Sequence, residues 1–153
     1  METFHEQFME LKAKHRRQLR GFLAIQPHHR RAEETCLKWE KSAEGRSSSV
    51  SISNLWARPS LNVYLHLRKE DRLEDAILFM QDHFGGEDGL TENGQYVGMN
   101  TIEFDYYPND TSLFVVQVHI IFPTDSLTCK AVETGTQPIY EMRCNGEVFQ
   151  PST

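Results

Sequence analysis

The chain has 153 residues and lacks most of the features from which a function is usually inferred. No apolar run approaches the ~20 residues of a membrane-spanning helix. The N-terminus mixes acids and bases with scattered Phe and Leu, unlike a signal peptide. No GxSxG, HExxH, P-loop or dinucleotide-binding motif occurs. These absences predict a cytoplasmic protein with no membrane segment, metal or cofactor, and they favour a non-catalytic one.

Cysteine is also scarce. Cys36, Cys129 and Cys144 are too few and too scattered for a disulfide framework or a zinc site. We therefore expect three partly buried thiols in a reducing compartment. The hydrophobic content of 39% and the charged content of 25% are ordinary for a globular chain, and the length suits one domain.

The net charge of −6 conceals an asymmetry. Residues 1–50 contain 10 Lys or Arg and 7 Asp or Glu, a net charge of +3, whereas residues 51–153 contain 6 and 15, a net charge of −9. Such a layout is typical of a nucleic-acid grip, of head-to-body association or of a partner with mixed charge. The isoelectric point near 5.6 argues against nucleic acid, because most binders are basic overall.

Two N-terminal helices are predicted, one on each side of Pro27. The first runs from about Glu2 to Leu23 and the second from about His28 to Ala43, because a proline has no N–H to donate within a helix. The first helix carries a face whose spacing follows the helical period: Phe4, Phe8, Leu11, His15, Leu19 and Phe22.

Basic residues gather in these two helices. They follow the opposite side of the first helix, and they crowd the start of the second, where the helix dipole disfavours cations. We therefore expect carboxylates, the chain's own or a partner's, to face them. A solvated helix face and nucleic-acid contact are the alternatives. The residues assigned here to a protein contact are Arg16, Arg17, Arg20, His28, His29, Arg30 and Arg31.

Beyond the helices the period changes to that of strands. Ser47–Asn54 and Leu61–Arg68 alternate strictly and predict two strands, and a helical period follows over Glu70–Phe84. Tyr96–Tyr107 and Ser112–Phe122 predict a hairpin. Its second arm is nearly all apolar, so we expect that arm at the centre of the sheet.

Turn residues set the remaining boundaries. Asn93-Gly94 predicts a tight turn within a polar loop over Glu87–Gln95, and Gly98 predicts a bulge. Leu127–Glu133 and Pro138–Cys144 predict a last hairpin, joined by a turn that contains Gly135.

The predicted fold class is α+β. An N-terminal helical pair over residues 1–45 precedes a sheet domain over residues 46–150, and the two form one compact unit. The domain is expected to be a mostly antiparallel five- to six-stranded sheet with one central helix packed on a face.

One candidate site is the polar face of this sheet. If the strand register brings the polar faces together, two imidazoles, two carboxylates, a guanidinium and a phenol converge there, which suits general acid–base work. Candidates for such chemistry are His66, Glu103, His119 and Tyr64. Candidates for binding a small ligand are Arg68, Asp105 and Gln117. The competing interpretation is an ordinary solvated sheet face.

A second candidate site is an acidic stretch over residues 70–92, where eight carboxylates accompany one Arg. Such a surface keeps a protein soluble, and it also steers basic partners. The residues assigned to a protein contact here are Glu74, Asp75, Asp82, Glu87 and Asp88. The favoured function is a small interaction protein, such as an inhibitor, an immunity protein or a phage- or virus-encoded antagonist, with a protein partner or a second copy of itself. A small enzyme or ligand-binding domain comes second and nucleic-acid binding third.

Overall fold

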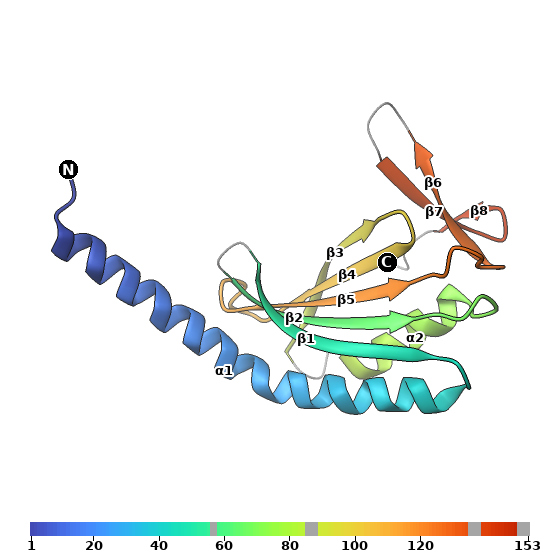
Figure 1. Ribbon diagram of the computed structural model, residues 1–153, viewed down its shortest axis with the longest axis horizontal. Helices are drawn as coiled ribbons and strands as arrows, with labels where there is room; N and C mark the ends of the chain where they lie inside the picture. Colours follow the sequence, from blue (N-terminus) through green and yellow to red (C-terminus); the bar gives the residue numbers. More distant parts are fainter. Residues whose placement is uncertain (56–57, 85–88, 135–138, 150–153) are drawn as a thin grey trace.

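Two helices, α1 (Phe4–Ser42) and α2 (Leu73–Phe84), pack on one face of a five-stranded sheet, and a smaller sheet stands beside it (Figure 1). The predicted α+β class is confirmed. The computed structural model describes residues 1–55, 58–84, 89–134 and 139–149. Within these ranges, no helix combines the length and the apolar character needed to cross a membrane.

The main sheet has the strand order β1-β2-β5-β4-β3. Its strands are β1 (Ser47–Leu55), β2 (Arg58–His66), β3 (Thr91–Val97), β4 (Thr101–Tyr107) and β5 (Val115–Ile121). Neighbouring strands are antiparallel except β2 and β5, which run parallel, so the sheet is mixed and not wholly antiparallel. The apolar β5 lies at the centre, as predicted, because it must be covered where the helices pack.

A second sheet holds β6 (Cys129–Thr134), β7 (Ile139–Cys144) and β8 (Glu147–Val148). The predicted last hairpin is confirmed as the antiparallel pair β6 and β7. It forms a sheet of its own and adds no sixth strand to the main one. Its turn, with Gly135, lies outside the described residues.

The expectation of three thiols is wrong for two of them. Cys129 and Cys144 are directly opposed in the β6–β7 register and form a disulfide. Cys36 is free and buried. The pairing depends on hairpin register, which puts two residues 15 positions apart face to face, and cysteine spacing alone carries no such information.

The predicted pair of N-terminal helices is also wrong, because α1 continues through Pro27 as one helix of 39 residues. A proline in a helix interior loses one hydrogen bond at a cost of about 3 kcal/mol. The packing of Ile25, Ala32 and Trp39 against the sheet offsets that loss, since all three are fully buried. A continuous helix also places His28–Arg31 in the middle of α1, so these residues do not crowd a helix start.

Gly21 explains how α1 approaches the sheet so closely. A Cβ atom at this position would collide with the Leu113 carbonyl oxygen and the Pro59 ring. The glycine therefore serves as a contact point at the end of the sheet, although it weakens a helix locally.

The prediction of a tight turn at Asn93-Gly94 is wrong. These residues lie inside β3, where the register shifts between Glu92 and Gln95, and Gly94 has a φ of 129°. They form a bulge, which a strand tolerates where a glycine can take positive φ. The chain reverses instead at Gly98–Asn100, where the Gly98 N–H donates to the Thr101 carbonyl oxygen. Gly98 is thus a turn residue rather than a bulge.

Candidate functional site

The first part of α1, here called the arm (residues 4–20), extends beyond the end of the sheet, which the helix meets at Gly21 (Figure 1). A capping box fixes its start: the Glu6 N–H donates to Thr3 Oγ1 and the Thr3 N–H donates to Glu6 Oε2. Beyond this cap the helix continues without a break into the half that packs on the sheet. The arm is therefore a helical extension of the folded body.

Large apolar side chains on the arm are exposed to solvent. Four of them share one side of the helix and are here called the arm stripe. Their side chains are half exposed or more: Phe4 (82%), Phe8 (50%), Leu11 (54%) and Leu19 (63%). The rings of Phe4 and Phe8 stack with centroids 6.2 Å apart. Isolated exposed apolar residues are common, whereas apolar residues gathered on one side of an exposed helix are unusual for a protein surface.

The basic residues of the arm lie on the sides of the helix that the stripe leaves: by helical spacing Lys12 and Arg16 border the stripe and Arg17 lies opposite it. Arg16, Arg17 and Arg20 are exposed, as expected of a charged helix side. A cavity of about 430 Å³ opens where the arm meets the end of the sheet, and Lys14, Arg17 and Pro59 contribute to its walls.

The two histidines of the basic cluster His28–Arg31 have partners within the chain. His28 packs on the ring of Phe114, with centroids 5.4 Å apart. His29 Nδ1 lies 2.7 Å from Glu33 Oε1 on the same helix. At least one carboxylate therefore faces this cluster, and it is the chain's own.

The strand register brings most of the predicted polar-face residues together. Tyr64 pairs with His119 across β2 and β5, and His119 pairs with Glu103 across β5 and β4. The rings of Tyr64 and His119 stack at 4.6 Å. In the next row, Gln117 pairs with Asp105, and Gln117 Nε2 donates to Glu103 Oε2 at 3.4 Å. We call Tyr64, Glu103, Asp105, Gln117 and His119 the polar cluster.

Two of the predicted residues are not in contact with this cluster. His66 lies on the same face but one row further along, opposite Ile121. Arg68 follows the end of β2 and turns toward Asp71. The Arg68 guanidinium therefore lies with Asp71 and not with the polar residues of the sheet face.

Burial controls the protonation of the polar cluster. It raises the pKa of Glu103 to about 7, together with a hydrogen bond to Asp105 and the charge of that neighbour. Burial also raises the pKa of Asp105 and lowers that of His119. His119 Nδ1 and Glu103 Oε1 are 3.3 Å apart, and the environment favours the uncharged form of each.

Two buried atoms of the cluster, Asp105 Oδ1 and His119 Nε2, have no hydrogen-bond partner among the described residues. A buried polar atom without a partner costs about 1–3 kcal/mol. A neutral imidazole beside a carboxyl that titrates near neutral pH can exchange protons with a bound molecule. The cluster therefore has the composition of an acid–base or ligand site.

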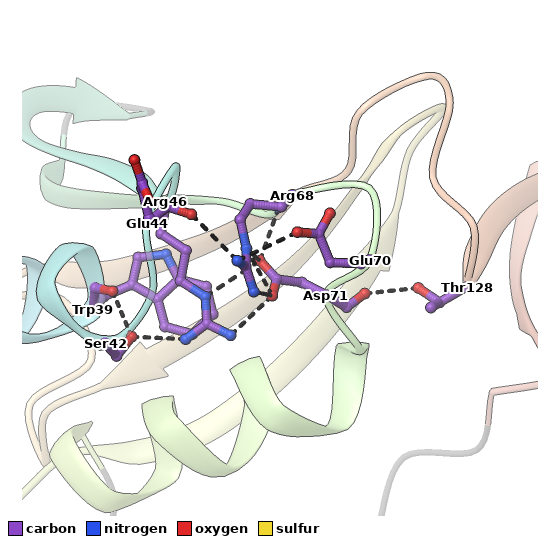
Figure 2. A network of polar contacts seen from close by, with 8 residues as sticks. All are labelled: Trp39, Ser42, Glu44, Arg46, Arg68, Glu70, Asp71 and Thr128. Carbon is purple, nitrogen blue, oxygen red and sulfur yellow. Dashed lines mark hydrogen bonds and ion pairs between the residues drawn. The ribbon is translucent and has the colours of Figure 1, made fainter.

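Arg68 belongs instead to a buried ion-pair network (Figure 2). Asp71 is only 3% exposed, and its Oδ1 accepts hydrogen bonds from Arg46 Nη2 at 2.9 Å and Arg68 Nη2 at 2.8 Å. Burial alone would raise the pKa of Asp71, but the hydrogen bonds from Arg68 and Arg46 hold it well below its usual range. Arg46 also stacks over the Trp39 ring at 4.1 Å.

This network joins separate elements of the fold. The Arg46 guanidinium donates to Ser42 Oγ at the end of α1, and Thr128 Oγ1 donates to the Asp71 carbonyl oxygen from the segment before β6 (Figure 2). Helix α2 begins at Leu73 rather than at Glu70 as predicted, and the Asp71 carbonyl oxygen just before it accepts from Thr128 Oγ1. Sequence analysis missed Arg46 and Asp71, and no local pattern links two residues 25 positions apart.

The acidic stretch is described only in part. Glu74, Asp75 and Asp82 are exposed on α2, together with Leu78. Glu87 and Asp88 lie outside the described residues. Among the residues that are described, no group of three or more His, Cys, Asp or Glu side chains is arranged to hold a metal ion.

Comparisons with protein-family models, with curated proteins and with solved structures find no match to this chain.

Proposed function

We propose that the protein is a non-catalytic interaction module that binds a protein partner through the arm. The exposed arm stripe supports this proposal most directly, since its four side chains are half exposed or more on one continuous helix. Burying a Leu or Phe side chain contributes about 1.5–3 kcal/mol, so covering the stripe would drive association.

The partner's chemistry follows from what lies beside the stripe. Lys12 and Arg16 are exposed on the arm, next to its apolar side. An amphipathic helix of this kind binds in an apolar groove, and carboxylates on the rim of the groove would complement its charge. An inhibitor, an immunity protein or a phage- or virus-encoded antagonist would use such an arm.

A second copy of the chain is one such partner. Its α2 carries Glu74, Asp75 and Asp82 around the exposed Leu78. The basic arm of one copy would then bind the acidic α2 of the next. Mass in solution, measured by light scattering at low and high salt, separates this arrangement from a complex with a different protein.

Differential capture from the native host tests the proposal. The bait proteins are the wild type, the variant Phe4→Ser/Phe8→Ser/Leu11→Ser, and a control with two exposed apolar residues changed outside the arm and α2, Met99→Ser/Leu127→Ser. A partner retained by the wild type and the control but lost by the arm variant supports the proposal. A set of bound proteins identical for all three baits contradicts it.

A second candidate function is small-ligand binding or catalysis at the polar cluster. The unpartnered Asp105 Oδ1 and His119 Nε2 support it, because a ligand with a donor and an acceptor would satisfy both atoms. Ligand-observed NMR with neutral amide and alcohol fragments tests it. Fragments that bind the wild type and not Asp105→Asn or His119→Ala favour this function, and equal binding by all three proteins removes it.

The cytoplasm remains our proposed location, although the disulfide between Cys129 and Cys144 argues for an oxidising compartment. Disulfides are rare in the reducing cytosol and common in oxidising compartments. The oxidation state of Cys129 and Cys144 in protein taken directly from the native host decides between the two. A reduced pair supports the cytoplasm, and an oxidised pair places the protein in an oxidising compartment.

A further inference from the structure

The edge strand β1 lacks the usual protection against pairing with another chain. It pairs with β2 without a register break from Ser47 to Leu55, and no strand of the described chain pairs with its other edge. Its nine residues include no charged residue and no proline, which are common ways to block an edge.

The opposite edge of the same sheet is built differently. β3 has seven residues, a bulge between Glu92 and Gln95, and a charged side chain. These are devices that prevent edge-to-edge pairing. The two edges of one sheet thus differ, and β1 is the edge that can accept a strand.

A groove runs beside this edge. α1 and β1 lie next to each other (Figure 1), and between them is a cavity of about 310 Å³. Side chains of both elements line it, among them His29, Glu33, Leu37 and Glu40 from α1 and Ser48 and Val50 from β1. A strand added to β1 would direct alternate side chains toward this groove.

The helix wall of the groove is acidic. Glu33 and Glu40 lie two turns apart on one side of α1. His29 Nδ1 contacts the Glu33 carboxylate at 2.7 Å, and Ser48 Oγ donates to Glu40 Oε1 at 2.9 Å, so both carboxylates are held at the groove. Leu37 lies between them and is largely exposed.

We propose that the β1 edge and the groove beside α1 bind an extended peptide segment of a partner protein. The segment pairs with β1 as a sixth strand and directs Lys or Arg side chains toward Glu33 and Glu40. Backbone hydrogen bonds supply affinity that depends little on sequence, and the two carboxylates select for basic side chains. This site is separate from the arm stripe.

Fluorescence anisotropy tests the proposal with a labelled nine-residue peptide of alternating valine and lysine. Two control peptides differ in one property each: one is methylated at every backbone nitrogen, and one has glutamate in place of lysine. The protein variant is Glu33→Lys/Glu40→Lys. Its control, Glu74→Lys/Asp75→Lys, changes the net charge equally on α2. A third variant, Phe8→Ser, reports on the arm.

We expect the lysine peptide to bind saturably to the wild type, to the α2 control and to Phe8→Ser. Binding should weaken at least about tenfold for either control peptide and for Glu33→Lys/Glu40→Lys. The absence of saturable binding, equal binding of the methylated peptide, or an equal loss in the α2 control would each overturn the proposal. Loss of binding in Phe8→Ser would also overturn it, since the site would then belong to the arm.

Discussion

His119 Nδ1 lies 3.3 Å from Glu103 Oε1, and burial favours the uncharged form of both residues. The contact is therefore not an ion pair of the usual kind. Below neutral pH, burial favours a contact between two uncharged groups on the polar face of the sheet, and Glu103 is the group that ionises near pH 7.

The stability of the protein should depend on pH through Glu103. Its pKa rises from 4.5 to about 7 on folding, so the stability it contributes is fully present below pH 4.5 and is lost as the pH rises toward 7. Glu103→Gln stays neutral at every pH. Between pH 5 and pH 8 the free energy of unfolding of the wild type should therefore fall by about 2 kcal/mol more than that of Glu103→Gln. Urea unfolding at the two pH values measures this difference. If Glu103→Gln and the wild type change in parallel, the carboxyl is not buried as described.

Asp71 should be essential for stability. Asp71→Asn leaves Arg46 and Arg68 without the carboxylate that they share, and breaking a buried ion pair from one side costs about 3–5 kcal/mol. Chemical denaturation measures the loss. The control is Glu70→Gln, which removes only an exposed contact to Arg68. Equal unfolding midpoints for the two variants would contradict the network.

Pro27→Ala should stabilise the protein. In a continuous helix the change restores a backbone N–H and removes a steric clash, with a gain of up to about 3 kcal/mol. If two helices met at this position, alanine would bring little gain, because proline suits the first turn of a helix. Thermal unfolding, together with helix content from circular dichroism, separates the two cases.

The disulfide should be detectable by counting thiols. Denatured protein without reductant should react at Cys36 alone, and reduction should raise the count from one to three. Cys129→Ser/Cys144→Ser should lower the free energy of unfolding by about 3 kcal/mol, the value for a loop of some 15 residues. Three reactive thiols in denatured, unreduced protein would contradict the pairing.

Local patterns predicted the parts of this fold that depend on local physics. Alternation over Leu61–Arg68 predicted a strand there, and the alternate apolar residues Leu61, Val63 and Leu65 are completely buried in β2. The two-residue period of a strand also predicted that Glu103 and His119 lie on polar faces of their own strands, β4 and β5. The register of these strands then places the two residues side by side. A helical period located α2 within a few residues.

Contacts between distant segments could not be predicted in this way. The parallel pairing of β2 with β5 joins Leu61 to Val116, and hairpin signals describe only neighbouring strands. Helix α1 passes through Pro27 because tertiary packing outweighs local propensity. The Arg68 side chain lies away from the sheet face because it pairs with a buried carboxylate, Asp71, three residues further along the chain.

Site-specific photo-crosslinking tests the central claim, that the arm binds a protein partner. A photoreactive amino acid is placed at Phe8 in one protein and at Leu78 on α2 in another, because both positions are exposed. After irradiation in the native host, we expect a defined cross-linked complex from position 8. A second copy bound through α2 would cross-link at both positions, and any other partner at position 8 alone. A protein that cross-links at neither position, or only at position 78, would contradict the arm as the binding surface.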